Sequence, residues 1–501
     1  MAISVKRKQN KFYPDSKRVI ARFYMPGGKG RGEYIIQKIL SLPENDVKII
    51  LNQVLSNFAQ RHRNITKEFE KNFNNISHIL DTLNITTNSL SMEQRLLIGS
   101  YFTHEYSIES AAFFNPSIVE DPNQTNLEKG QKRIIVSFRA TGEGHISSIV
   151  FRSGIIDKDN ELVFKPVNTL VEQPDVIKIH SYNKSRFYLK LDEMNIHKDI
   201  VKTVMDRLDD NFTYSELHKS IHECVENVAL SYSKKNVIRS LIWLANTNYE
   251  ITFSLDTALS ERVIFPVSDS EKNGIEDARF VRFTEDDGSV KYYATFTAYN
   301  GFTILPKLLE TKDFYHFSVS PVFGKYAQNK GMALFPRKIN GRYAMISRID
   351  GFNNYIMFSE NIQDWQNAEK IEEPIYPWEF VQIGNSGSPI ETEKGWLLIT
   401  HGVGPMRKYC LGLTLLDLEN PTKVLCQLDE PLLIPNDEER EGYVPNVVYS
   451  CGSIIHNNEL IIPYGMSDSA SSFVSVPLDD LFAKLAQCSH VLFSHITQYN
   501  R

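Results

Sequence analysis

The apolar positions of this 501-residue chain follow two different periods, which divide it into helical and strand-rich zones. From about residue 33 to residue 95, apolar residues such as Ile36, Ile39 and Leu40 recur at intervals of three and four, as on one face of a helix. The same spacing returns between about residues 192 and 245. We therefore predict helices in both stretches.

The rest of the chain consists of short apolar or alternating runs separated by turns, which is typical of β-strands. One pattern recurs: a polar residue or glycine leads into an aromatic and aliphatic run that ends near a polar residue. We find it at residues 133–139, 291–297, 342–348, 395–401 and 459–464. The later intervals fit a four-stranded propeller blade with its loops, and the helical stretch accounts for the longer first interval.

These zones predict an all-β core that forms a five-bladed β-propeller with helical additions. We expect an N-terminal helical extension over residues 1–100, the propeller over 101–485 with a helical insertion at about 185–247, and a C-terminal tail over 486–501. A sandwich or several small β domains would show similar short strands, so these folds stay open. In a propeller, polar residues at the ends of the runs gather at the channel mouth. Here they are Arg139, Thr297, Arg348, His401 and Tyr464.

Composition limits the partners that we expect. The net charge is −6 and the basic residues are scattered, so we expect no nucleic acid and no acidic membrane surface as a partner. No apolar run is long enough to span a membrane and no secretion signal is evident, so we predict a cytoplasmic protein. The five cysteines are widely spaced without a C-x-x-C pair, which predicts reduced thiols and no metal site.

The segment at residues 274–279 carries the clearest candidate chemistry. It places Glu276, Asp277 and Arg279 between a polar turn and a strand-like run. Because side chains alternate faces in a strand, the adjacent carboxylates can face one substrate only if a bulge intervenes. One carboxylate is then a candidate acid and the other supports it. A structural ion pair with the arginine is the alternative interpretation.

Two further groups are candidates for the channel mouth. Basic residues and their hydrogen-bonding neighbours would bind a small oxyanion: Arg139, Arg152, Lys330, Lys338, His401, Arg407 and Tyr409. Aromatic and polar residues suit a sugar: Tyr299, Trp365, Trp378, Tyr443, Asn115, Ser117 and Asp468. The alternative is that the charges pair on separate blades and that the aromatic residues belong to the core.

Several motifs occur together in a fixed order. They are Asn115-Pro116-Ser117, Phe138-Arg139-Ala140, the segment at 274–279, and the segments at 334–341, 401–403, 415–421 and 441–448. In this combination the chain resembles glycoside hydrolase family 130, the inverting mannoside phosphorylases and mannosidases that act on β-mannosidic bonds. The resemblance covers roughly residues 105–480 and implies a five-bladed β-propeller. The two helical zones, and Arg337 where an acidic residue is common, depart from the family pattern and leave the acceptor sugar open.

The resemblance assigns expected roles. Asp277 corresponds to the general acid, and Asn115, Arg139 and Asp468 fall where residues that hold the mannosyl unit are expected. We place Ser117, Glu276, Arg279 and Tyr299 with them in the substrate site. The expected phosphate-binding residues are Lys330, Lys338, His401, Arg407 and Tyr409.

Chemistry favours phosphate over water as the nucleophile. A phosphorylase needs cations around phosphate and no base carboxylate, because phosphate is already anionic at neutral pH. Because this chain keeps His401, Tyr409 and Lys338, we expect phosphorolysis of manno-oligosaccharides, with inorganic phosphate as co-substrate and no cofactor. An inverting β-1,2-mannosidase is the first alternative and would need a second carboxylate, such as Glu441 or Glu143. A carbohydrate-binding propeller without turnover is the second, and a homo-oligomer remains possible.

Overall fold

The computed structural model describes residues 3–178, 181–194, 196, 199–225, 232–301 and 304–488. Outside two helical stretches, these residues form mainly antiparallel β-sheets, and five of the sheets contain four or more strands. The prediction of a mostly β core is confirmed. Across the described ranges, no helix is both long enough and apolar enough to cross a membrane.

Two of the large sheets contain segments that are distant in the sequence. One sheet contains β4 (Ala112–Glu120), β5 (Lys132–Thr141), β6 (Ser147–Ile156), β7 (Leu162–Phe164) and β12 (Val263–Ile264). The other contains β8 (Asp175–Lys178), β11 (Tyr249–Thr252), β13 (Ile275–Thr284), β14 (Val290–Tyr299), β15 (Ile304–Thr311) and β16 (His316–Pro321). β8 pairs with β11, so the helical stretch between them begins and ends at the edge of this sheet.

The other three large sheets follow in chain order, except for one strand from the start of the chain. One contains β17 (Ala333–Leu334), β18 (Tyr343–Ser347), β19 (Asn354–Ser359) and β20 (Ala368–Glu372). The next contains β21 (Gln382–Asn385), β22 (Ile390–Thr392), β23 (Gly395–Val403), β24 (Tyr409–Leu416) and β25 (Val424–Gln427). The last contains β1 (Lys6–Arg7), β26 (Val448–Tyr449), β27 (Ile454–His456), β28 (Glu459–Met466) and β29 (Ala470–Pro477).

Each of the five predicted runs forms a strand of a different sheet. The strands are β5, β14, β18, β23 and β28. Their residues are largely buried, and β23 is buried along its whole length, so the side chains on both faces of these strands are covered. Neighbouring sheets touch through β4 and β13, β14 and β17, β18 and β21, β24 and β26, and finally β28 and β4.

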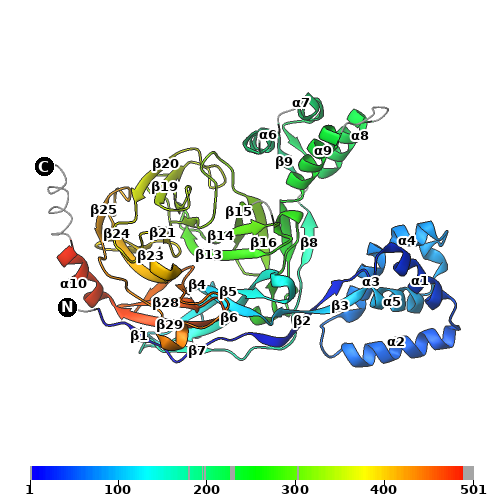
Figure 1. Ribbon diagram of the computed structural model, residues 1–501, viewed down its shortest axis with the longest axis horizontal. Coiled ribbons are helices and arrows are strands. Elements are labelled where there is room, and N and C mark those ends of the chain that lie inside the picture. The colour runs from blue at the N-terminus through cyan, green and yellow to red at the C-terminus, as the bar shows by residue number, and fades with distance from the viewer. Residues whose placement is uncertain are drawn as a thin grey trace.

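The first helical stretch packs around a core of its own. It contains α1 (Lys29–Leu40), α2 (Glu44–Phe58), α3 (Ile65–Asn75), α4 (Ser77–Thr82) and α5 (Met92–Tyr101). Ile36, Phe73 and Leu97 are buried where the apolar helix faces meet. The paired strands β2 (Asp15–Phe23) and β3 (Thr103–Glu109) lead from these helices to the sheets, and the helices stand to one side of the sheets (Figure 1).

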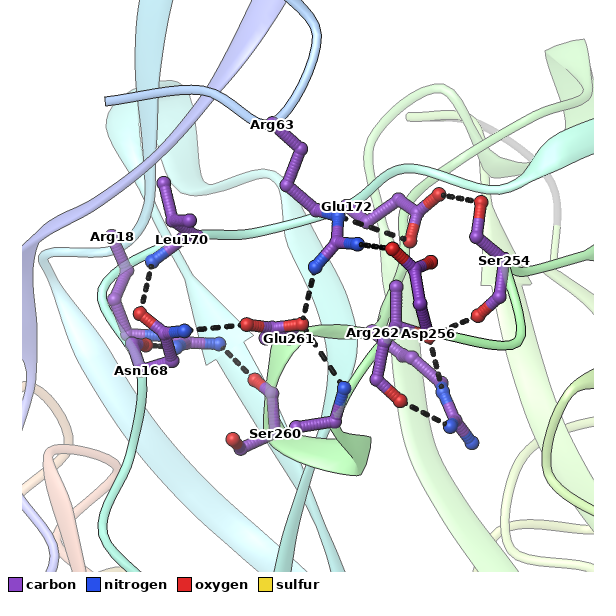
Figure 2. Close-up of polar contacts among 12 residues, drawn as sticks. Arg18, Arg63, Asn168, Leu170, Glu172, Ser254, Asp256, Ser260, Glu261 and Arg262 are labelled. Atoms are coloured by element: carbon purple, nitrogen blue, oxygen red, sulfur yellow. Dashed lines mark hydrogen bonds and ion pairs between the residues drawn. The ribbon is translucent and has the colours of Figure 1, made fainter. Parts of the chain in front are cut away.

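An arginine in the loop between α2 and α3 holds the helices against the β core. Arg63 Nη1 lies 2.8 Å from Glu261 Oε2, and Nη2 lies 2.7 Å from Asp256 Oδ2. Its Nε lies 3.8 Å from Glu172 Oε2. Figure 2 shows Arg63 between these three carboxylates, which we call the Arg63 cluster.

The second helical stretch also has its own core. It contains β9 (Tyr182–Asn183), α6 (Lys184–Glu193), α7 (Asp199–Met205), β10 (Asn211–Phe212), α8 (Tyr214–Val225) and α9 (Tyr232–Ala245). Leu191, Val204 and Leu241 are buried among these helices, which extend away from the sheets (Figure 1). The last described helix is α10 (Leu478–Cys488), so the predicted tail begins inside a helix, and its residues 489–501 lie outside the described residues.

Candidate functional site

The acid candidate sits on a bulge at the start of β13. The pairing of β13 with β14 shifts register between Glu276 and Arg279, and Asp277 has φ 54°. Such a bulge re-aims one side chain. Arg139 Nη1 lies 3.3 Å from Asp277 Oδ1, while its Nη2 lies 3.0 Å from Glu276 Oε1. The bulge that the adjacent carboxylates require is present, and both face one guanidinium.

A glycine allows this bulge to lie close to the neighbouring sheet. Gly274 has φ 128°, a conformation that side chains with Cβ rarely adopt. A Cβ atom at this position would lie only 2.4 Å from Ser147 Oγ. Ser147 Oγ instead donates a hydrogen bond of 2.9 Å to the carbonyl of Ile275. The turn before Asp277 is therefore pressed against β6.

A second bulge brings Asn115 to the same place. The pairing of β4 with β5 shifts between Phe114 and Ser117, and Asn115 has φ 49°. Asn115 Nδ2 donates to Asp277 Oδ1 at 2.7 Å. Ser117 is placed differently: it is 1% exposed, and its Oγ accepts a hydrogen bond from the backbone nitrogen of Phe280. Ser117 is therefore buried between two strands, where its hydroxyl is used to join them, whereas we expected it in the substrate site.

Lys330 and Asp468 complete the charges around Asp277. Lys330 Nζ lies 2.5 Å from Glu276 Oε2 and 5.8 Å from the centre of the Tyr299 ring. Asp468 follows β28 in a turn with φ 51°. We call Arg139, Glu276, Asp277, Lys330 and Asp468 the Arg139 cluster.

The pKa values of the two aspartates in this cluster are shifted in opposite directions from their ordinary values. Burial acts to raise the pKa of Asp277, but Arg139, Arg279, the Asn115 hydrogen bond and Lys330 together hold that pKa below its ordinary value. Burial, reinforced by the negative charge of Asp277, raises the pKa of Asp468 to about 6. Environments that push two neighbouring pKa values apart are typical of acid–base sites.

A second polar cluster lies beside the first and is joined to it by Arg279. Arg279 is 2% exposed, and its Nη2 donates to Tyr449 Oη at 2.7 Å and to the carbonyl of Asn385 at 3.4 Å. The positive charge of Arg279 acts on both Asp277 and His401. We call Arg279, Arg348, Asn385, His401 and Tyr449 the Arg279 cluster.

His401 orients Arg348 in this cluster. Its Nδ1 lies 3.0 Å from the carbonyl oxygen of Asn385, which can only accept, so Nδ1 carries the hydrogen. Nε2 then accepts from Arg348 Nη1 at 3.2 Å. Burial, with Arg348 and Arg279 nearby, holds the pKa of His401 well below its usual value. The imidazole is therefore neutral at physiological pH.

The remaining predicted phosphate residues are only partly brought together. The Tyr409 ring stacks at 6.0 Å from His401, and the exposed Arg407 lies in the turn before β24 with φ 55°. Lys338 pairs with Asp286 and follows Arg337, which bridges to Thr284 at the far end of β13. That end is roughly 20 Å from Asp277 at about 3.3 Å per residue. Lys338 therefore does not belong to this site.

Three other candidates are placed elsewhere. Arg152 is buried against Glu109, with its Nη2 3.0 Å from Oε2. Trp365 is 0% exposed in the core and offers no surface for a sugar. Tyr464 donates its hydroxyl to Glu439 at 2.6 Å rather than to the site. The spacing of apolar residues along the sequence does not show where these three side chains lie.

Sequence reasoning missed two members of the Arg279 cluster, Asn385 and Tyr449. Arg348 ends the third recurring run and was expected at the channel mouth, but it was given no role in binding. Asn385 and Tyr449 end or lie on the short strands β21 and β26, where no pattern marks them. Over the described ranges, no group of three or more His, Cys, Asp or Glu residues is placed to hold a metal ion.

Comparison with known proteins adds a family match. A family model described as beta-1,4-mannooligosaccharide phosphorylase matches residues 228–486, which is about half of the chain. The matched range includes Asp277, the Arg279 cluster and Asp468.

Curated relatives are phosphorylases. A beta-1,2-mannobiose phosphorylase from Listeria innocua is 27% identical over 350 residues, covering 67% of this chain and 90% of that protein. A 1,2-beta-oligomannan phosphorylase from Thermoanaerobacter sp. is 39% identical over 155 residues, or 30% of this chain and 52% of that protein. The chain thus spans about half the length of the second relative. A solved structure of a beta-1,2-mannobiose phosphorylase from Listeria innocua matches with 22% identity and a TM-score of 0.45, covering 76% of this chain and 93% of that one.

Proposed function

Because this chain belongs to glycoside hydrolase family 130, whose members act on β-mannosides, we propose that it is an inverting mannoside phosphorylase. It cleaves the terminal β-mannosidic bond of a manno-oligosaccharide with inorganic phosphate and releases mannose 1-phosphate. The five large sheets, each holding one copy of the recurring run, are proposed to be the blades of a propeller, with the helical stretches as additions.

One observation carries the choice of phosphate as nucleophile. Arg279 is nearly fully buried, yet within the described parts of the chain neither Arg279 nor Arg348 forms a salt bridge with a carboxylate. Buried charges are normally paired, so two guanidiniums held by neutral partners indicate a place for an external anion. Arg279 and Arg348 are the core of the proposed phosphate clamp, and Lys330, which pairs with Glu276, is a third cation at its edge. His401 aims Arg348, and Tyr409 lines the same side.

The Arg139 cluster is the proposed mannosyl and acid site. Asp277 donates the proton to the leaving oxygen, and Asn115 and Arg139 orient Asp277 while Asp468 binds the sugar. The C–O bond to the leaving sugar breaks as phosphate attacks the opposite ring face, which inverts the anomeric centre.

The low pKa of Asp277 suggests an order of events. Without phosphate, Arg139 and Arg279 keep Asp277 ionised, which is unsuitable for an acid. Bound phosphate offsets the charge of Arg279, so the pKa of Asp277 rises and the carboxyl takes up a proton. Phosphate thus supplies the nucleophile and also prepares the acid.

A hydrolase is the second candidate and needs a base carboxylate across the sugar. Glu143, in a short 3-10 helix, and Glu441, in a loop, are both exposed, whereas Asp468 lies beside Asp277. Asp468 is therefore the carboxylate that would activate water if the enzyme were a mannosidase.

Product analysis separates these candidates. The protein is incubated with β-1,2- and β-1,4-linked manno-oligosaccharides, with and without phosphate, and mannose and mannose 1-phosphate are quantified. We expect phosphate-dependent mannose 1-phosphate from one of the linkages. Release of free mannose at the same rate without phosphate would contradict the phosphorylase assignment and favour the hydrolase.

A further inference from the structure

A buried ion pair with a tyrosine lies behind the turn that carries Asp277, and we call Tyr249, Glu271 and Lys307 the triad. Lys307 on β15 places Nζ 2.5 Å from Glu271 Oε1, and both side chains are 0% exposed. Tyr249 Oη donates to the same oxygen at 2.8 Å. Lys307 Nζ also donates to Ser268 Oγ at 3.1 Å.

The triad holds a loop rather than filling space. The second carboxylate oxygen of Glu271 accepts hydrogen bonds from the backbone nitrogens of Val267 at 2.8 Å and Ser268 at 3.1 Å. Burial lowers the pKa of Lys307. A buried ion pair of this kind contributes little net stability compared with apolar packing, so its effect is better sought in the conformation that it fixes.

That conformation is the approach to Asp277. The carbonyl of Glu271 accepts from the backbone nitrogen of Gly274 at 2.6 Å. Asn273 and Gly274 are then tied to Tyr299 by backbone hydrogen bonds of 2.9 and 3.3 Å. Gly274 lies three residues before Asp277, so a displacement of Glu271 would pass directly into the bulge.

Tyr249 connects this triad to the second helical stretch. It is the first residue of β11 and follows the end of α9 at Ala245 by four residues. It also pairs in register with Lys178 of β8, on the other side of the same stretch. The seating of the helices and the hydrogen bond to Glu271 therefore depend on the same short strand.

We propose that Tyr249, Glu271 and Lys307 are positioning residues that hold the turn from which Asp277 delivers its proton, and that Tyr249 couples this delivery to the seating of the second helical stretch. The inference rests on the proposed function. In the reaction, the glycosidic C–O bond breaks, the bond from C1 to phosphate forms, and the Asp277 proton passes to the departing sugar oxygen. Misplacing the turn would slow the proton transfer and leave phosphate attack otherwise intact.

The test measures the Tyr249→Phe and Lys307→Met variants with two different mannosyl donor substrates. One donor is the manno-oligosaccharide, whose leaving oxygen needs a proton. The other is β-mannosyl fluoride, whose fluoride departs with little help from an acid. We expect kcat on the oligosaccharide to fall about 10-fold with KM nearly unchanged, less than the roughly 10²- to 10⁴-fold that general acid catalysis contributes as a whole, because the acid is misplaced and not removed. The loss on the fluoride should be at most about 2-fold, because the turn matters only for proton delivery.

Tyr293→Phe is the matched control. Tyr293 is also buried in this sheet and donates to a glutamate, Glu285, but at 3.4 Å and away from the turn. The Tyr293→Phe variant should leave the ratio of kcat on the oligosaccharide to kcat on the fluoride unchanged. Equal losses on both donors in Tyr249→Phe, or no loss on either, would overturn the proposal. Tyr249→Phe alone decides the matter if Lys307→Met fails to fold.

Asp277→Asn separates this inference from the proposed function. It should lose activity on the oligosaccharide and keep most of it on the fluoride. If Asp277→Asn loses both equally, the acid assignment fails. If Asp277→Asn behaves as expected and Tyr249→Phe does not change the ratio, only the positioning proposal fails.

Discussion

Two arginines in this protein each lie among carboxylates, and their surroundings differ. Arg63 faces Glu172, Asp256 and Glu261 where the N-terminal helices meet the β core (Figure 2). Arg139 faces Glu276 and Asp277 at the bulge of β13. By charge alone the two clusters look alike.

In the Arg63 cluster the buried carboxylate has several further partners. Glu261 also accepts from Asn168 Nδ2 at 2.5 Å and from the backbone nitrogen of Ala258 at 3.0 Å. Glu172 accepts from Ser254 Oγ at 2.8 Å. These bonds fix chain segments to one another, which is what a structural seam requires.

In the Arg139 cluster, by contrast, the surroundings shift the pKa values of two neighbouring carboxyl groups in opposite directions. The pKa of Asp277 is lowered while that of Asp468 is raised to about 6, and the neighbouring Arg279 has only neutral hydrogen-bond partners. The contrast teaches that a count of ion pairs does not identify a site. Unequal protonation and an unpaired buried cation are the more informative signs.

Asp277→Asn should give the largest difference between the clusters. We expect kcat to fall about 10² to 10⁴-fold, since this is what general acid catalysis contributes. The free energy of unfolding, measured with denaturant, should change little because Asn keeps the shape. Glu261→Gln is the counterpart in the Arg63 cluster and should keep kcat within about 3-fold. Normal activity in Asp277→Asn would remove the acid assignment.

Exchanging each arginine for methionine should separate catalysis from stability. Arg139→Met should lower kcat/KM about 10- to 100-fold, because hydrogen bonds to charged groups contribute about 1.5–3 kcal/mol. Arg63→Met should lower the free energy of unfolding by about 2 kcal/mol, less than for a fully buried pair because Arg63 is 23% exposed. Its kcat/KM should stay near that of the wild type. A loss of kcat/KM in Arg63→Met together with unchanged kcat/KM in Arg139→Met would contradict the assignment of the two clusters.

The raised pKa of Asp468 predicts how stability depends on pH. A carboxyl whose folded pKa is raised to about 6 favours the folded state below its unfolded pKa, and this contribution is lost as pH rises through 6. Asp468→Asn should therefore raise the melting temperature relative to wild type at pH 8 but not at pH 4. Equal shifts at both pH values would show that Asp468 has an ordinary pKa.

Asp256→Asn should give the smallest effect. Asp256 is 76% exposed, so its pair with Arg63 is screened by solvent and should contribute less than about 1 kcal/mol. The small loss in unfolding free energy should disappear in 1 M salt, where screening is strong. A loss that persists in high salt would mean that packing, not charge, is responsible.

Much of the fold follows from local pattern. The alternating run at 291–297 lies inside β14 and the apolar run at 395–401 inside β23, because a strand buried on both faces must be apolar along its length. The helical spacing near Ile36 and Ile39 likewise corresponds to α1. These features depend on neighbours in sequence, which a single sequence records.

Much less of the site follows from pattern. Asp277 and Arg139 could be named because they lie in distinctive motifs, but Lys338 and Ser117 could not be excluded because their partners come from other strands. No sequence pattern marks Arg63, because its carboxylate partners lie more than a hundred residues away in the sequence. Contacts of this kind depend on how loops turn, which periodicity does not encode.

The reverse reaction tests the central claim most directly. The protein is mixed with α-mannose 1-phosphate and mannose, without other phosphate, and both inorganic phosphate and mannobiose are followed over time. An inverting phosphorylase uses the α-anomer as donor, so we expect phosphate and a β-linked disaccharide to appear in equal amounts. Cleavage of manno-oligosaccharides by the same preparation, with no phosphate released from mannose 1-phosphate, would contradict the account.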